Sequence, residues 1–479
     1  MAPLQVDPSK IPLSLASCSI GLPRHNLHSK LEAISQAGLQ GIELSFPDLQ
    51  SHANELVRLG QLKPSSGKGD EVAEDDWPAL CEAAKHIKHL CDTHNKLKII
   101  VLQPFGNFEG WPKGSEERRK VWEKADGWVK IMESCGCDML QVGSTDTPSS
   151  KGIPSDKKQL ASDLAGLADM LAPKGFRIAY ENWCWATHAP TWKDVWEVVQ
   201  LADRDNIGLC LDTFQSAGGE WGDPTTQSGR IEREGLSESS LQASWRDSLR
   251  ELSRTVPAEK IYFLQVSDAY HVQPPLAANP EPNDDSGLRP RGRWSHDYRP
   301  LPYDGGYLPI ADFVRAVLET GFRGWFSVEV FDGQFDKKYG DDLMKYAEKA
   351  KASNAKLVKE AAAMESLRSN NGVPNPVTGS QPVVQFHRAP LSGSPPPALL
   401  HPLEYPAVMS SSASGWLYSQ GFKNPSGGSP SDLRAALRSA TTPANTGEEA
   451  EVPDTRVERF LSMTWKAWPC AATSGMALP

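Results

Sequence analysis

Short apolar runs alternate with amphipathic stretches between about residues 10 and 360 of this chain. The runs are rich in Ile, Leu and Val, which is typical of parallel strands buried on both faces. Between them, apolar positions recur at helical spacing, as in Leu31, Ile34 and Ala37. We predict eight strands, at residues 13–17, 41–45, 98–102, 139–142, 177–181, 207–212, 261–266 and 325–329.

The order of these elements predicts the fold class. Eight strand–helix repeats without a dinucleotide-binding glycine motif favour an α/β (β/α)8 TIM barrel over residues 10–360. A doubly wound sheet is the rival, but it would normally stop at fewer strands.

The composition changes near residue 366, where Pro, Ser and Gly become frequent. Such a sequence buries too little apolar surface to offset the entropy of ordering, so we predict a mostly disordered tail over residues 361–479. Near its end, RVERFLSMTWKAW places apolar side chains near helical spacing. Two interpretations stay open: a docking helix, or a segment without function.

Charge and composition narrow the possible functions. The chain has 50 basic and 60 acidic residues, which argues against nucleic-acid binding by general charge attraction. The apolar runs are far shorter than the roughly 20 residues of a membrane span, and the N-terminus has no secretory pattern. The eight cysteines are scattered, as expected of reduced thiols. We therefore expect a cytoplasmic protein that binds neither nucleic acid nor membrane.

Polar residues stand at the ends of most of the predicted strands. They are Glu43, Gln103, Gln141, Glu181, Asp212, Gln265 and Glu329. The last four belong to strands five to eight, which are neighbours in a barrel, and barrel enzymes place their working residues at the C-terminal ends of strands. Carboxylates held together in a buried mouth need a cation, and oxygen donors select a hard divalent ion. We predict Mg²⁺ or Mn²⁺, with Co²⁺ as a further option.

Several motifs carry a resemblance to a known family. In chain order they are GIELSF at 41–46, LQPF at 102–105, AYENWCW at 179–185, GLCLDTF at 208–214, YFLQVSDA at 262–269, RWSHDYR at 293–299, GGYLP at 305–309 and GWFSVEVF at 324–331. From about residue 10 to 335, the chain resembles the xylose-isomerase-like TIM barrels and, within them, the fungal 3-dehydroshikimate dehydratases. The resemblance implies a metal held by Glu181, Asp212, Gln265 and Glu329.

The same resemblance implies a reaction and further site residues. The reaction is the metal-dependent dehydration of 3-dehydroshikimate, a small cyclic hydroxy-keto acid, to protocatechuate in quinate and shikimate catabolism. Ser295 and Arg299 match the WSxxxR positions and are expected to bind substrate and support catalysis, with Arg299 steadying a carboxylate or developing charge. Gln103 and Glu43 are expected to contact substrate; for Gln103, a metal-bound water is the alternative.

The sequence also departs from the family. Gln215 follows LDTF, where bacterial relatives carry a candidate catalytic histidine, so no base can be transferred to that position. His188 and His296 stand where close fungal relatives tend to have Arg. Either histidine is a candidate base, because its pKa range suits proton abstraction near neutrality.

Two other functions remain as alternatives. One is a sugar or polyol isomerase or epimerase on the same barrel, in which Glu181 and Glu329 would double as proton shuttles. Gln265 disfavours it, because such enzymes usually offer a histidine at that position. The other is an inactive scaffold with a partner-binding tail, which four intact ligand positions disfavour. The oligomeric state stays open, with a homodimer as one option.

Overall fold

The computed structural model describes residues 6–65, 71–278, 288–364 and 367 of the chain. Eight parallel strands close into a barrel in chain order, and the last strand pairs with the first. The barrel strands are β1 (Leu13–Ala16), β2 (Gly41–Ser45), β3 (Lys98–Gly106), β4 (Met139–Gly143), β5 (Arg177–Glu181), β6 (Ile207–Asp212), β7 (Ile261–Val266) and β9 (Trp325–Val328). The TIM barrel predicted from the apolar runs is confirmed.

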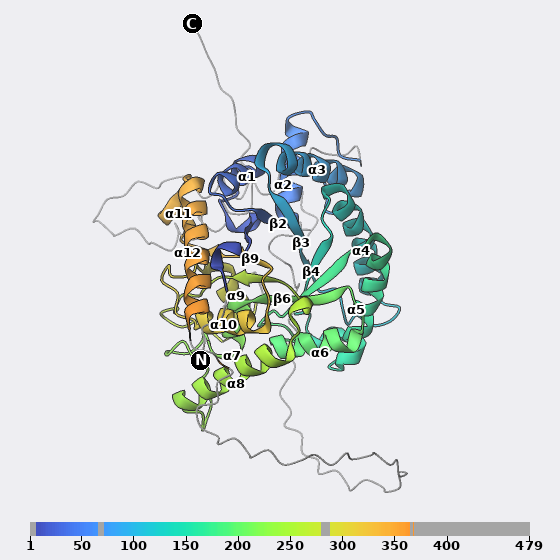
Figure 1. Cartoon of the computed structure of the whole chain (residues 1–479). Coiled ribbons are helices and arrows are strands. Elements are labelled where there is room, and N and C mark those ends of the chain that lie inside the picture. Colours follow the sequence, from blue (N-terminus) through green and yellow to red (C-terminus); the bar gives the residue numbers. More distant parts are fainter. Residues whose placement is uncertain (1–5, 66–70, 279–287, 365–366, 368–479) are drawn as a thin grey trace, which may run out of the picture. The chain divides into compact units, whose positions relative to one another are not determined.

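Helices surround the strands, as Figure 1 shows for α1 to α6. The helices are α1 (Leu27–Gln36), α2 (Phe46–Arg58), α3 (Trp77–His89), α4 (Glu116–Cys135), α5 (Lys157–Leu171), α6 (Trp192–Ala202), α7 (Thr213–Glu220), α8 (Glu238–Thr255), α9 (Pro290–Asp297), α10 (Ile310–Thr320), α11 (Phe335–Tyr339) and α12 (Leu343–Ala363). Short helical turns lie at Pro8–Lys10, Ser17–Ser19, Leu90–Asn95, Ser149–Lys151, Ala172–Lys174 and Ala258–Lys260.

Local sequence explains where these helices begin and end. α6 starts behind Thr191, whose hydroxyl accepts the N–H of Asp194 while the Asp194 carboxylate accepts the N–H of Thr191. α4 starts behind Ser115 and ends at Gly136, which adopts a φ of 71° that a residue with a Cβ rarely takes. These caps satisfy backbone groups at the helix ends that would otherwise lack a partner.

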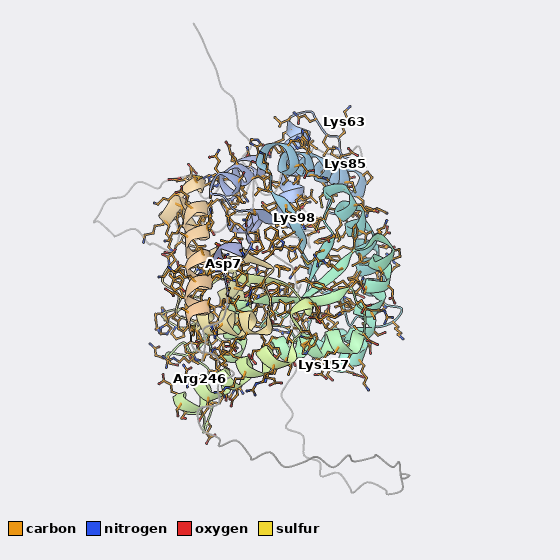
Figure 2. The ribbon with its side chains drawn as sticks, viewed as in Figure 1. Asp7, Lys63, Lys85, Lys98, Lys157 and Arg246 are labelled. Carbon is orange, nitrogen blue, oxygen red and sulfur yellow. The ribbon has the colours of Figure 1, made fainter. Side chains whose placement is uncertain are left out.

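The core has two apolar regions, and side chains fill the space between strands and helices (Figure 2). The large region contains side chains such as Trp128, Leu164 and Phe313. The smaller cluster includes Val101 and Phe263, and both are fully buried. Within the described residues, no helix has the length and apolar character needed to cross a bilayer.

Two features at the C-terminal ends of the strands were not predicted. β3 continues past residue 102 to Gly106, because Phe105 and Gly106 pair with β4. A second, two-stranded antiparallel sheet joins β8 (Tyr298–Arg299) to β10 (Phe331–Asp332). This small sheet links the segment after β7 to the segment after β9. Residues 368–479 of the predicted tail lie outside the described part of the chain.

Candidate metal centre

Three carboxylates meet at the C-terminal ends of the barrel strands. Glu181 closes β5, Asp212 closes β6, and Glu329 directly follows β9. One oxygen from each lies within 4.8 Å of the others, and all three residues are buried. The strands thus bring together three of the four residues that the sequence predicted as metal ligands.

Burial and mutual repulsion perturb these acids. Burial raises the pKa of Glu181 well above its ordinary value, and the nearby Glu329 and Asp212 charges raise it further. Burial likewise raises the pKa of Glu329 to about 7, although the Arg299 charge opposes that shift. The pKa of Asp212 is also raised by burial against the opposing Arg299 charge. Ionising all three carboxylates therefore requires more positive charge than Arg299 alone supplies.

Arg299 is the cation that the chain itself places in this cluster. Its Nη2 donates to Asp212 and lies 3.0 Å from Glu329 Oε2. Its Nε donates to Ser267 Oγ at 2.7 Å, and its Nη1 to Ser295 Oγ at 3.4 Å. The guanidinium also lies over aromatic rings, those of Phe214 and Phe331. The predicted pair Ser295 and Arg299 is brought together here, and β8 carries the arginine.

Glutamine side chains from other strands hold the glutamates of this centre. Gln103 Nε2 donates to Glu329 Oε1 at 3.1 Å, and Gln141 Nε2 donates to Glu181 Oε2. Gln265 lies opposite Asp212 in the strand register and donates to Glu43 Oε2 at 2.7 Å. Sequence reasoning noted Gln141 as a strand-end residue but gave it no role. The hydrogen bond to Glu181 supplies one.

The donor set fits a hard divalent cation. Glu181 Oε1 is buried and has no hydrogen-bond partner, which leaves a free oxygen in the cluster. Asp212 Oδ1 accepts the N–H of Gln215 at 2.7 Å, so Oδ2 is the oxygen on the Arg299 side. Fully ionised, the three carboxylates and one guanidinium carry a formal charge of minus two. A divalent ion would balance that charge, and carboxylate oxygens suit Mg²⁺ or Mn²⁺.

The two candidate histidines have different surroundings. His296 Nδ1 lies 2.6 Å from the carbonyl oxygen of Gly292, which can only accept, so this nitrogen carries the proton. Its Nε2 is therefore the basic atom, and burial lowers the pKa of His296. Its ring lies 6.2 Å from the ring of Phe331, over which Arg299 also lies. The described contact of His188 is with Ser149 Oγ, 3.2 Å away.

The remaining sequence candidates, Gln215 and Glu43, are both buried. Gln215 has a structural contact, since its Oε1 accepts the backbone N–H of Cys184 at 2.9 Å. Sequence reasoning missed Ser267, which holds Arg299, although it belongs to the QVSDA stretch. It also gave no role to Phe214 and Phe331, which end the motifs GLCLDTF and GWFSVEVF but whose contact with Arg299 depends on the folded chain.

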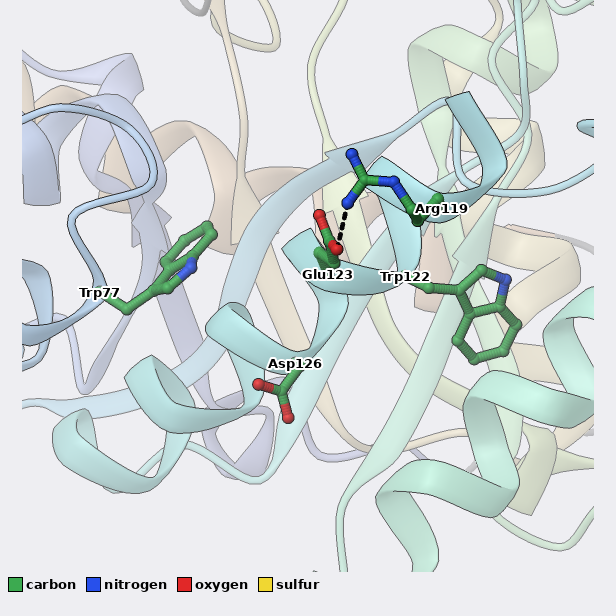
Figure 3. Close-up of a pocket in the computed structure, with 5 residues that line it drawn as sticks. All are labelled: Trp77, Arg119, Trp122, Glu123 and Asp126. Atoms are coloured by element: carbon green, nitrogen blue, oxygen red, sulfur yellow. Dashed lines mark hydrogen bonds and ion pairs between the residues drawn. The ribbon is translucent and has the colours of Figure 1, made fainter. Parts of the chain in front are cut away.

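A separate hollow lies on the outside of the barrel (Figure 3). Trp77 of α3 lines it together with Arg119, Trp122, Glu123 and Asp126 of α4. Arg119 and Glu123 form an ion pair across one turn of α4. The residues lining this hollow include none of the three clustered carboxylates.

Comparison with known proteins gives the same picture of the fold. A family described as "Xylose isomerase-like TIM barrel" matches residues 31–364. Among solved structures, a xylose isomerase-like TIM barrel/4-hydroxyphenylpyruvate dioxygenase fusion protein superposes with a TM-score of 0.51 at 24% identity. That match covers 72% of this chain and 42% of the fusion protein.

Two curated proteins with similar sequences are both described as 3-dehydroshikimate dehydratases. A 3-dehydroshikimate dehydratase of Neurospora crassa is 32% identical over 361 residues, which are 74% of this chain and 94% of that protein. A 3-dehydroshikimate dehydratase of Pseudomonas aeruginosa is 29% identical over 309 residues, which are 64% of this chain. The match covers 37% of the bacterial protein, so this chain spans a little over a third of its length.

Proposed function

Because the chain belongs to the xylose isomerase-like TIM barrel family, we propose that it catalyses the metal-dependent dehydration of 3-dehydroshikimate to protocatechuate. The similarity along 94% of the Neurospora crassa dehydratase supports this substrate. The observation that carries the proposal is the buried cluster of Glu181, Asp212 and Glu329 at the strand ends. Such a cluster suits a reaction in which negative charge develops on a substrate oxygen.

The metal is expected to be held by the three carboxylates and by Gln265. A bound divalent cation would polarise the substrate ketone and stabilise the negative charge formed when the adjacent carbon loses a proton. Gln141 and Gln103 would support this arrangement, because each donates a hydrogen bond to one of the glutamate ligands. Gln103 then acts through Glu329, or on the substrate directly.

The other groups are assigned to substrate binding and proton transfer. Arg299, with Ser295 beside it, would steady the substrate carboxylate or the developing charge. His296 would take a proton from the carbon next to the ketone at Nε2, because Nδ1 is committed to Gly292. The same proton is then given to the departing hydroxyl group, which leaves the ring as water. Tautomerisation of the ring gives the aromatic product. His188 is the alternative base.

The test is a continuous ultraviolet assay for protocatechuate. Metal-stripped protein would be mixed with 3-dehydroshikimate and then given Mg²⁺ or Mn²⁺. We expect metal-dependent product formation that falls by at least about a hundredfold in Glu329→Gln. Glu123→Gln is the matched control, because that glutamate is exposed on α4 and pairs with Arg119 on the outer surface.

Each other outcome would contradict the proposal in a different way. Metal binding without turnover of 3-dehydroshikimate would move the function to another substrate, and sugars or polyols would then be assayed for isomerisation. Folded protein that binds no divalent ion would support a scaffold. Equal activity in Glu329→Gln would contradict the assigned site.

A further inference from the structure

α9 carries or precedes the groups assigned above to substrate binding and proton transfer. Ser295 and His296 lie within this helix, and Arg299 follows it in β8. With eight residues, α9 is shorter than the roughly 12–15 residues that an isolated helix needs in water, so contacts with other elements fix its position. Residues that make these contacts therefore decide where the three side chains stand.

Arg289, the residue before α9, connects this helix to two loops at the C-terminal ends of the strands. Its Nη1 donates to the carbonyl oxygen of Trp185, and its Nη2 donates to the Asp146 carbonyl oxygen at 3.1 Å and to Thr187 Oγ1 at 3.0 Å. Asp146 lies in the loop after β4, whereas Trp185 and Thr187 lie in the loop after β5. The Thr187 hydroxyl donates to the Thr147 carbonyl oxygen at 2.8 Å, which leaves its own oxygen to accept from Arg289. One guanidinium thus holds both loops, because its N–H groups point in several directions.

Trp185 is held through its backbone and through its side chain. Arg289 binds its carbonyl oxygen, and its indole N–H donates to Asp146 Oδ2 at 3.0 Å. The indole stacks on the ring of Trp183, with ring centres 5.5 Å apart, and it also meets the ring of His296 at 6.2 Å. Arg289 therefore binds the loop that presents the indole and precedes the helix that presents the imidazole.

α9 has further anchors that do not involve the loop after β5. Arg291 Nε donates to the carbonyl oxygen of Gly218 in α7 at 2.8 Å. Trp294 Nε1 donates to the carbonyl oxygen of Tyr270 at 3.0 Å. Loss of Arg289 is therefore expected to loosen α9 on the side of the β5 loop without detaching the helix from the barrel.

From these contacts we infer that Arg289 is a positioning residue, which joins α9 to the loops after β4 and β5 and so keeps His296 in place against Trp185. The inference rests on the proposed function, in which His296 and Arg299 act on the substrate. The acceptors of Arg289 are backbone oxygens and a hydroxyl group, and the proposed reaction uses none of them. Its loss should therefore change turnover but not metal affinity.

Two substitutions of Arg289 and one remote control test this role. Arg289→Ala removes the guanidinium, whereas Arg289→Lys keeps the positive charge but replaces the planar fork with a single ammonium group. Arg323→Ala is the matched control, because Arg323 Nη1 also donates to backbone carbonyl oxygens, those of Leu318 and Phe322. Arg323 precedes β9 and so lies at the opposite end of the barrel from the carboxylates.

The first readout is amide hydrogen exchange in residues 290–297 of the full chain, which needs no substrate. We expect exchange there to become at least about tenfold faster in Arg289→Ala and in Arg289→Lys, and to stay unchanged in Arg323→Ala. The Mn²⁺ dissociation constant should stay within about twofold in all three variants, because the partners of Arg289 are not partners of the proposed ligands.

The second readout is turnover in the ultraviolet assay. We expect kcat to fall about 10–100-fold in both Arg289 variants, since small displacements of reacting groups have effects of this size, while KM rises by no more than about threefold. Ethylguanidinium added to Arg289→Ala should raise kcat at least about threefold by occupying the vacated place, and it should not change Arg323→Ala.

Other outcomes overturn the inference. Unchanged exchange in residues 290–297 would show that Arg289 does not hold α9, and faster exchange with full turnover would show that the contact does not position reacting groups. Full activity in Arg289→Lys, or an equal loss in Arg323→Ala, would contradict the role of the planar fork. If the unmodified protein does not convert 3-dehydroshikimate, the dehydratase proposal fails by itself; faster exchange then supports the anchoring role, and unchanged exchange removes it.

Discussion

Arg299 Nη2 and Glu329 Oε2 lie 3.0 Å apart at the C-terminal ends of the barrel strands. The arginine is 1% exposed, so this ion pair is removed from solvent. The contact joins β8 to the end of β9 and places a fixed positive charge beside the carboxylates proposed to hold the metal. A bound metal and the Arg299 guanidinium would then contact the same carboxylates. A substitution of Arg299 can therefore change metal affinity and turnover in different directions.

Replacing Arg299 with Gln is expected to leave Mn²⁺ binding at least as tight, because a cation that repels the metal is removed. Turnover of 3-dehydroshikimate should fall about a hundredfold or more, since the group proposed to steady substrate charge is lost. Calorimetry and the ultraviolet assay measure the two quantities. Arg246→Gln, an exposed substitution on α8, is the control. Weaker Mn²⁺ binding with unchanged turnover would contradict the assignment.

Metal binding should release protons and strengthen as pH rises. The pKa of Glu329 is raised to about 7 by burial, and that of Glu181 lies well above its ordinary value. Below pH 7 these carboxyl groups hold protons that a cation must displace, so Mn²⁺ affinity should increase between pH 6 and 8. Calorimetry in two buffers of different ionisation enthalpy counts the protons. Affinity independent of pH, with no proton release, would count against a carboxylate site.

Glu109 should make stability depend on pH. Its Oε1 accepts the Tyr180 hydroxyl at 2.8 Å and the Thr145 N–H at 2.7 Å, while Oε2 has no partner. Burial raises the pKa of Glu109 from 4.5 to about 7. The folded chain therefore keeps a proton that the unfolded chain loses, and stability declines as pH rises from about 4.5 through about 7.

Glu109→Gln removes this titration. Relative to the unmodified protein, the variant should gain about 2–3 kcal/mol in free energy of unfolding between pH 5 and pH 8. Urea unfolding of both proteins at the two pH values measures the difference, and groups common to both cancel. A difference that does not change with pH would show that Glu109 ionises normally in the folded protein.

Gly143 should tolerate no side chain. A Cβ at this position would lie 1.9 Å from the Trp183 ring, and Gly143 is the register partner of Glu181. Gly143→Ala is expected to lower the free energy of unfolding by about 2–3 kcal/mol and to reduce turnover, because Trp183, which must move, follows the proposed ligand Glu181 by two residues. Thermal unfolding and the ultraviolet assay report the two effects.

Gly114→Ala is the matched control for Gly143→Ala. Gly114 has a φ of +82°, but nothing lies within 4 Å of the position that a Cβ would take, so its cost comes from backbone strain alone, about 1 kcal/mol. An equal loss of stability in the two variants, with full turnover in both, would show that Trp183 moves aside without consequence.

The folded part of the chain is expected to need α12 to its end. Arg315 Nη1 donates to the carbonyl oxygens of Ala361 and Ala362, and the N–H of Leu367 donates to Glu319. We propose that a chain ending after residue 367 keeps its fold and activity. Ending it after residue 360 should lower stability by a few kcal/mol, because the buried Arg315 guanidinium loses both carbonyl acceptors of Nη1 and keeps the Glu319 carboxylate at Nε. Melting temperature and turnover of both truncations check this, and poor folding of the longer one would contradict it.

The barrel could be predicted from sequence because its strands are short apolar runs with regular spacing. The three carboxylates could be predicted because each stands at a strand end, and strand ends converge in a closed barrel. The hydrogen-bond partners of the residues at the strand ends could not be predicted from the sequence. Whether Gln265 meets Glu43 depends on two side chains reaching across the barrel from strands that are distant in sequence.

Two other features had no readable signal in the sequence. β8 and β10 have two residues each, too few for any periodic pattern. Glu109 looks like a loop acid in the sequence, and only the packing of Tyr180 against it reveals a buried carboxyl group. Two departures from the family motifs could be located in the sequence, but their contacts could not: Gln215 Oε1 accepts the backbone N–H of Cys184, and His296 Nδ1 lies against the carbonyl oxygen of Gly292.

The pairing of β8 with β10 connects the loop after β7 to the loop after β9. Tyr298 and Arg299 are bonded to Asp332 and Phe331, and Tyr270 adds a hydroxyl bond to Asp332 at 3.0 Å. If the loops that contain β8 and β10 move to admit a substrate, they have to move together or break the hydrogen bonds between these two strands. Arg299, the residue proposed to supply positive charge to the reaction, is thus also part of this two-stranded sheet, so a substitution that changes one of these properties also alters the other.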